Sequence, residues 1–119
     1  MDAMADCLFC SIIAGDVPAD IIHRDDRVVA FRDVNPQAPV HVLVVPIRHI
    51  VNAGTVVADD ADDVVALFVA AKAVADAEAI GADDRGYRLV LNVGPDALNS
   101  VPHLHLHLLG GRSLDWPPG

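Results

Sequence analysis

Three of the six histidines stand at alternate positions in one short segment, His103-Leu104-His105-Leu106-His107-Leu108-Leu109. Side chains alternate between the two faces of a β-strand, so the imidazoles would share one face at intervals of roughly 6.6 Å. Three interpretations fit: an exposed polar face, a catalytic zinc centre, or phosphate chemistry in which one imidazole attacks phosphorus while its neighbours bind charge or donate protons. We favour the third, because a solvated face is usually built from Thr, Lys, Glu or Ser.

A second group with chemical potential is the pair of cysteines in Cys7-Leu8-Phe9-Cys10, which has the spacing of half a zinc site. A structural disulfide is not expected in a reducing compartment. A thioredoxin-like redox pair would lie in a βαβ unit, and the sequence pattern indicates no such unit. Two buried free thiols are the alternative to a metal site.

The composition limits the classes of partner. Lys and Arg number 8 and Asp and Glu number 17, so the formal net charge is −9 with neutral His. This balance argues against a nucleic-acid coat, which needs clustered cations, but it permits a local phosphate site. Apolar stretches end well before the 18 residues or so of a spanning helix, and residues 1–6 carry acid where a signal peptide carries base. We therefore expect a cytoplasmic protein without a membrane partner.

Hydrophobic periodicity predicts the elements that must position these groups. The regular segments expected are a short helix over 7–15, strands over 21–24, 28–31, 41–45, 87–92 and 103–109, and a long helix over 59–80. Gly81 is expected to end the long helix, whose apolar face is expected to hold Val64, Leu67, Phe68, Ala71 and Val74. Short turns indicate antiparallel strands with one helix packed on one face, which is an α+β fold in a single domain, 1–119.

Several motifs together resemble one known family. The segments that carry the likeness are the triad His103–Leu109, the loop and strand Asp33–His41, and the short stretches Asn99–Val101, Gly110–Arg112 and Trp116–Gly119. With these motifs the chain resembles the histidine triad (HIT) superfamily from Cys7 to Gly119, in its Hint-like nucleotide-binding branch of the bacterial zinc-containing type. The resemblance implies a HIT-like fold: a five-stranded antiparallel sheet with one long and one short helix, extended across a homodimer.

The resemblance also implies an activity. Members of this branch are purine nucleoside phosphoramidases, which hydrolyse the P–N bond of AMP- or GMP-linked amines through a nucleotidyl-histidine intermediate. By position, His105 is the nucleophile, His107 contacts phosphate oxygens or the leaving group, and His41 joins the same cluster. Ser100 matches the serine that donates to the leaving atom.

The substrate-binding residues follow from the same likeness. Asp33 matches the acid that accepts from both ribose hydroxyls, Asn92 matches a contact near the ribose and phosphate, and Ser100, His105 and His107 are expected to contact the phosphate. The apolar positions that match the base pocket are Leu8, Phe9, Ile12, Phe31 and Val34. Ordinary core packing is the alternative for the apolar set.

For the metal, the resemblance implies four ligands, Cys7, Cys10, His49 and His103. A Cys2His2 set has no open position, so the zinc would be structural and would leave the other triad histidines free. No organic cofactor is expected. His23 is expected to be a surface residue.

Two alternatives to the phosphoramidase stay open. Pro102 before the triad resembles the dinucleoside polyphosphate hydrolase branch, whereas the Trp116–Gly119 tail favours the Hint-like branch, where the tail lies near the partner subunit's site and influences the leaving group. The third possibility is a nucleotide-binding regulatory protein with little turnover. In each case the expected partners are a purine nucleotide and a second copy of the chain, without nucleic acid.

Overall fold

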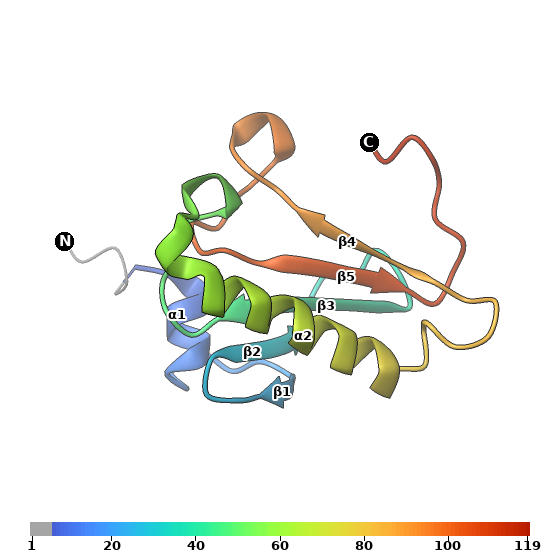
Figure 1. Ribbon diagram of the computed structural model, residues 1–119, viewed down its shortest axis with the longest axis horizontal. Coiled ribbons are helices and arrows are strands. Elements are labelled where there is room, and N and C mark those ends of the chain that lie inside the picture. The colour runs from blue at the N-terminus through green and yellow to red at the C-terminus, as the bar shows by residue number, and fades with distance from the viewer. Residues whose placement is uncertain (1–5) are drawn as a thin grey trace.

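The computed structural model describes residues 6–119. The prediction against a signal peptide rests on the acidic residues within 1–6, of which 1–5 lie outside the described part. Five strands form one antiparallel sheet in the order β1-β2-β3-β5-β4 (Figure 1). The elements are α1 (Leu8–Ile13), β1 (Ile21–Arg24), β2 (Val28–Arg32), β3 (Val40–Pro46), α2 (Ala61–Ala77), β4 (Tyr87–Leu91) and β5 (Leu106–Gly110), with 3₁₀ turns η1 (Ala53–Thr55), η2 (Ala58–Asp60) and η3 (Pro95–Ala97). The predicted α+β class and five-stranded sheet are confirmed.

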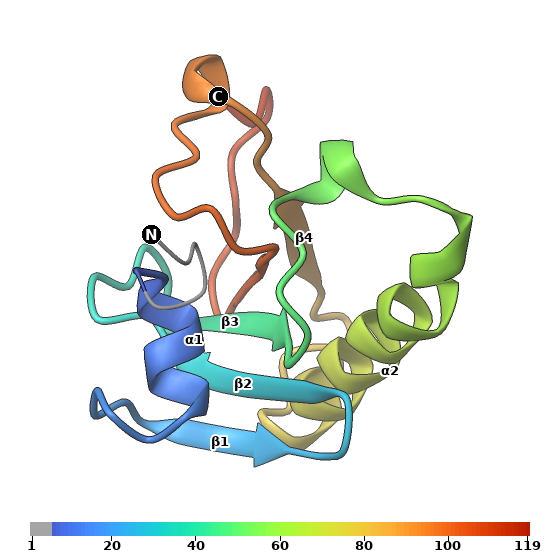
Figure 2. The same cartoon turned by 90° about the vertical axis from the view of Figure 1, so that its left-hand side faces the viewer.

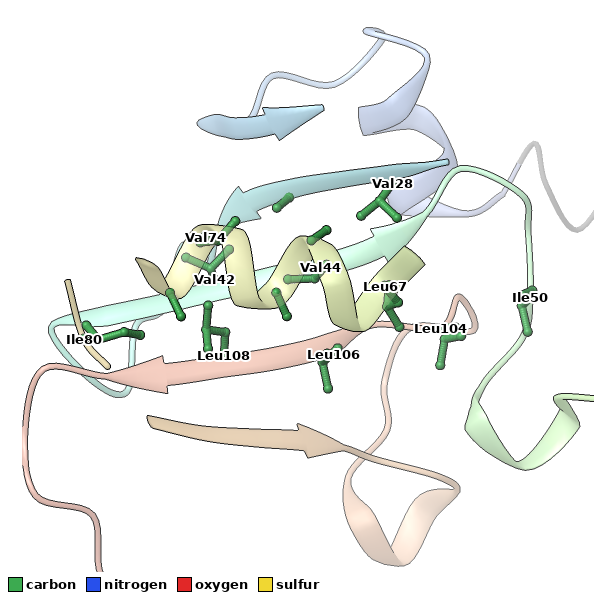
Figure 3. Close-up of a cluster of buried hydrophobic side chains, with 14 residues drawn as sticks. Val28, Val42, Val44, Ile50, Leu67, Val74, Ile80, Leu104, Leu106 and Leu108 are labelled. Carbon is green, nitrogen blue, oxygen red and sulfur yellow. The ribbon is translucent and has the colours of Figure 1, made fainter. Parts of the chain in front are cut away.

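Helices cover both faces of the sheet (Figure 2). Alternate residues of the central strands point to α2 and form the larger core, which includes Val42, Val44, Leu106 and Leu108 (Figure 3). The other face packs against α1. The residues of that second core are Cys7, Phe9, Ile12, Val29, Phe31, Leu43 and Val45. We expected one helix on one face, but burial of Phe9 and Ile12 makes the short helix a second covering layer.

The long helix is shorter than predicted. It begins at Ala61 after the turn η2 and ends at Ala77, not at 59 and 80. The end is a Schellman motif: Ile80 N–H donates to Ala75 O at 3.2 Å and Ala79, with φ 56°, donates to Asp76 O at 3.2 Å. Burial of the Ile80 side chain draws the chain back onto the core, so the helix stops before Gly81.

The face that α2 buries also differs from the prediction. Leu67, Ala71 and Val74 are buried as expected, but Phe68 is 44% exposed and alanines at 70 and 75 take the remaining core positions. The prediction for Phe68 was wrong because the buried face of α2 runs through Leu67, Ala70, Ala71, Val74 and Ala75, which leaves position 68 at its edge.

The triad segment is a strand only in its second half. Strand β5 starts at Leu106, and the residues before it follow a bend in which His103 N–H donates to Val101 O at 2.9 Å and Leu104 N–H donates to Ile50 O at 2.6 Å. The alternation nevertheless holds, because Leu104, Leu106 and Leu108 all lie in the core beneath α2. Among residues 6–119, no helix is long and apolar enough to span a membrane. The cytoplasmic location stays a prediction.

Candidate functional site

The second triad histidine is held by its neighbour's backbone. His105 Nδ1 lies 2.7 Å from the carbonyl oxygen of His103. A carbonyl only accepts hydrogen bonds, so Nδ1 carries the hydrogen and Nε2 keeps its lone pair. The ring is fixed further by edge contacts, at centroid distances of 5.0 Å to Phe9 and 5.1 Å to His107. In its neutral form, the His105 ring therefore offers an oriented lone pair at Nε2.

A chain of hydrogen bonds fixes the tautomers of the two neighbouring histidines. The backbone N–H of Gln37 donates to His41 Nδ1 at 3.0 Å, so the hydrogen of neutral His41 is on Nε2. That Nε2 lies 2.9 Å from His107 Nδ1 and 3.4 Å from a carboxylate oxygen of Asp33. His41 thus donates to His107, and the remaining hydrogen of His107 is on Nε2, where it is available as a donor.

Burial keeps this pair of rings neutral. It lowers the pKa of His41, an effect that the Asp33 carboxylate opposes. Burial, as the largest cause, and the charges of the neighbouring His105 and His41, as smaller ones, lower the pKa of His107 to about 4. At neutral pH both rings therefore keep the donor and acceptor roles that the hydrogen bonds assign.

These side chains meet at a cavity of about 370 Å³ between α1, the end of β2 and the segment before β5. The lining includes nine predicted site residues: Leu8, Phe9, Ile12, Phe31, Asp33, Val34, Ser100, His105 and His107. Phe9, Ile12 and Phe31 are also buried in the smaller core, so the pocket and core interpretations both apply to them. Val34, although it lines the cavity, is 99% exposed.

Two predicted residues lie off the cavity wall. His41 stands behind His107 and reaches the cavity only through it. Asn92 follows the last residue of β4 and is not among the lining residues. Six further lining residues carry no chemical signal in the sequence and were not predicted: Val17, Pro18, Ala19, Arg32, Leu43 and Val101. A larger, more open hollow of about 680 Å³ lies along residues 84–88 and 111–114, where it gathers arginines but no histidine.

A separate cluster brings together the four predicted metal ligands. Cys7 Sγ is 3.3 Å from His103 Nδ1, and Cys10 Sγ is 3.4 Å from the same atom and 3.3 Å from His49 Nδ1. All four ligand atoms lie within 4.8 Å of one another. Sulfur and nitrogen ligands of a tetrahedral zinc are about 3.6 Å apart, so the spacing fits such an ion.

The surroundings of His103 also fit metal binding. Its Nε2 lies 2.8 Å from Pro46 O and must donate there, which turns the Nδ1 lone pair toward the cysteine sulfurs. Burial lowers the pKa of His103, favouring the neutral ring that a metal ligand needs. In addition, Cys10 N–H donates to Cys7 Sγ at 3.4 Å, which suits a thiolate.

A second set of close ligand atoms, on Asp33, His41 and His107, does not fit a metal in the same way. The Gln37 N–H at His41 Nδ1 places the hydrogen of His41 on Nε2, the atom that faces the other two residues. A protonated nitrogen offers no lone pair. The tautomers thus distinguish a ligand cluster around His103 from a hydrogen-bonding cluster around His107.

Comparison with known proteins agrees with this arrangement. The HIT domain family matches residues 14–114. An uncharacterized HIT-like protein of Synechococcus elongatus is 48% identical, and the match covers 96% of this chain and 97% of that protein. A 14 kDa zinc-binding protein of Brassica juncea is 41% identical, and the match covers 96% of this chain and 100% of that protein.

Two solved structures are also similar. The HIT family hydrolase from Legionella pneumophila has TM-score 0.90 and 46% identity, covering 95% of this chain and 99% of that one. The histidine triad nucleotide-binding protein from Candida albicans has TM-score 0.80 and 26% identity, covering 93% and 82%. The chain therefore belongs to the HIT domain family.

Proposed function

We propose that this protein is a hydrolase of nucleotidyl phosphorus, and specifically a purine nucleoside phosphoramidase that cleaves the P–N bond of AMP- or GMP-linked amines. The observation that carries the proposal is the hydrogen bond from His105 Nδ1 to His103 O, which leaves Nε2 as an oriented nucleophile at a cavity of nucleotide size. The hydrolase and nucleotide-binding names of the two similar structures support the same class.

In the first step, His105 Nε2 attacks the α-phosphorus, a P–N bond to the enzyme forms, and the P–N bond to the amine breaks. The imidazole becomes cationic, and its Nδ1–H bond to His103 O stabilises that charge. The Nε2–H of His107 and the hydroxyl of Ser100 are the donors on the cavity wall for the phosphoryl oxygens and the departing nitrogen. The departing nitrogen takes up its proton from solvent while these donors hold it, because a neutral imidazole or a serine hydroxyl that lost its own hydrogen would be left as an anion.

In the second step, water attacks the phosphorus of the nucleotidyl-histidine. The bond between phosphorus and His105 breaks, the nucleoside monophosphate leaves, and a proton of the water passes to solvent, which balances the proton that the amine took up. Asp33, at the end of β2 on the cavity wall, supplies two acceptor oxygens for the ribose hydroxyls. Phe9, Ile12 and Phe31 supply the apolar surface for the base.

The charges around the cavity favour an amine as leaving group over a polyphosphate. Among the described residues that line the cavity, Arg32 is the one with a permanent positive charge, and it pairs with Glu78 at 2.5 Å and Asp20 at 3.5 Å. A polyphosphate leaving group needs cations to offset its charge. We therefore rank dinucleoside polyphosphate hydrolysis second.

We further propose that Cys7, Cys10, His49 and His103 hold a structural zinc ion, as the fit of the cluster and the name of the Brassica juncea relative suggest. Bound there, zinc supplies a tetrahedral cross-link between α1, the segment after β3 and the triad segment. The residue that His105 bonds, His103, is itself one of the ligands. The same four ligands leave no position for substrate.

A homodimer through the edge strand β4 completes the proposal. Tyr87, Leu89 and Leu91 alternate along this strand and are 39%, 37% and 37% exposed. They lie on an edge with unpaired backbone groups, which a second copy can pair and cover. Light scattering coupled to size exclusion measures the mass directly, and a monomer would exclude this part of the proposal.

The proposed activity is tested with AMP linked to a lysine ε-amine, comparing wild type, His105→Ala and His23→Ala. His23 is the matched control, because it pairs with Asp25 on the β1–β2 turn, away from the cavity. We expect turnover by wild type and His23→Ala and a loss of at least about 10⁴-fold in His105→Ala. Equal rates in wild type and His105→Ala would refute the assignment of the nucleophile. Binding of AMP without turnover by wild type would favour a nucleotide-binding protein.

A further inference from the structure

A guanidinium from the end of the chain braces the loop between β2 and β3. Arg112 donates to the carbonyl oxygen of Gln37 through Nε at 3.2 Å and Nη2 at 2.9 Å, and its Nη1 donates to Ser113 O at 2.9 Å. The preceding Gly111 has φ +89° and lies so close to the loop that an added Cβ would be 3.0 Å from Pro39 Cβ. The turn after β5 is therefore packed onto the loop at two successive residues.

The residue that Arg112 holds also sets the tautomer of a site histidine. The N–H of Gln37 is the donor to His41 Nδ1 at 3.0 Å, and His41 Nε2 then lies 2.9 Å from His107 Nδ1. One continuous series of hydrogen bonds thus runs from Arg112 through Gln37 and His41 to His107. Its last member is on the cavity wall, whereas Arg112 itself lines the separate hollow outside the site.

We propose that Arg112 is a positioning residue, which acts through the backbone of Gln37 to keep His41 in the Nε2–H tautomer that His107 requires. The inference rests on the proposed function for its kinetic consequence only. If the loop moves away, His41 Nδ1 loses its donor and the hydrogen of the ring can shift to Nδ1. His41 Nε2 and His107 Nδ1 would then be two acceptors facing each other, and His107 would lose its orientation.

Two contacts that hold Asp33, the other loop residue of the site, do not involve Arg112. Asp33 N–H donates to His41 O at 3.0 Å, and Asp33 Oδ1 accepts from Asn35 N–H at 2.9 Å. Removing the guanidinium leaves both contacts in place. We therefore expect the loss of Arg112 to lower kcat, which depends on His107, and to leave KM, which depends on nucleotide contacts such as Asp33, nearly unchanged.

The test compares Arg112→Ala with Arg112→Lys and with Arg24→Ala. Arg24 is a matched control, because its guanidinium also donates twice to one backbone carbonyl, Ile13 O, at 3.2 and 3.3 Å, but away from the loop. Imidazole ¹⁵N shifts report the tautomer of His41 in the intact protein. Steady-state kinetics on AMP linked to a lysine ε-amine report kcat and KM.

We expect wild type and Arg24→Ala to show the Nε2–H tautomer of His41, and Arg112→Ala to show a mixture of tautomers and a kcat about 10-fold lower at a KM within about 2-fold. Lysine retains one donor, so Arg112→Lys should recover part of both effects. An unchanged His41 tautomer in folded Arg112→Ala would overturn the inference. A decrease in the kcat of Arg24→Ala as large as that of Arg112→Ala would overturn it as well. The two failures are separable: a wild type without turnover refutes the proposed function, whereas the tautomer measurement still decides the role of Arg112.

Discussion

Replacing His107 by asparagine should keep the hydrogen bond from His41 but remove the ability of this position to bind a proton. Asparagine Oδ1 can accept from His41 Nε2–H as the ring nitrogen does, but it does not titrate. In the native protein, burial and the adjacent His105 and His41 lower the pKa of His107 from 6.5 to about 4. The folded state therefore resists protonation of this ring, whereas the unfolded chain accepts a proton near pH 6.5.

The sign of the effect on stability follows from this difference. The stabilising preference for the neutral ring is present above pH 6.5, and it is lost as the pH falls from 6.5 toward 4, because the unfolded state then binds more protons. A shift of this size corresponds to about 3.4 kcal/mol at the limit. Partial exposure of the ring lets solvent screen it, so we expect about 1–2 kcal/mol.

The assay is urea unfolding of wild type and His107→Asn at a series of pH values between 7.5 and 4.5. We expect the wild type to lose about 1–2 kcal/mol more than the variant over that range, since only the wild type has the titrating ring. The ionisable groups that do not interact with His107 are common to both proteins and cancel in the difference, so the difference reports His107 together with its coupling to His41 and His105. A difference in free energy of unfolding that does not change with pH would show that His107 is not held neutral by burial.

Three further predictions concern the metal, the ribose and the core. Cys10→Ala should lower the bound zinc from about one ion per chain to almost none by elemental analysis, with Ser11→Ala as the neighbouring control; retention of the metal would exclude this ligand set. Asp33→Asn should raise KM for a ribonucleotide substrate about 10-fold and much less for a 2′-deoxy substrate, and an equal increase for both would remove the ribose contact. Leu108→Ala, at a side chain with 0% exposure in the core beneath α2, should destabilise the protein by about 3–4 kcal/mol, whereas Leu98→Ala, at 85% exposure, should change stability by less than about 0.5 kcal/mol in the same denaturation experiment.

The sequence predicted the elements well because their signals are local. Alternation of histidine and leucine placed Leu104, Leu106 and Leu108 in the core, although β5 begins only at Leu106. What the sequence could not supply were effects of tertiary packing. Burial of Ile80 ends α2 early, and Ala70 and Ala75 take core positions on α2 while Phe68 is exposed.

The candidate site divides in the same way. Residue types and spacing singled out the triad and the cysteines, and the structure brings Cys7, Cys10, His49 and His103 together. The tautomers were not predictable, because they depend on backbone groups of His103, Pro46 and Gln37 that any residue could provide. The contact of Arg112 with Gln37 spans 75 positions in the chain and has no local signature.

The proposed mechanism requires that His105 becomes covalently nucleotidylated during turnover. The direct measurement is to quench wild-type protein during hydrolysis of AMP linked to a lysine ε-amine, and to locate the bound AMP by peptide mass spectrometry. We expect an AMP adduct on His105 that is absent in His105→Ala. An adduct on a different residue, or sustained turnover with His105 unmodified throughout, would contradict it.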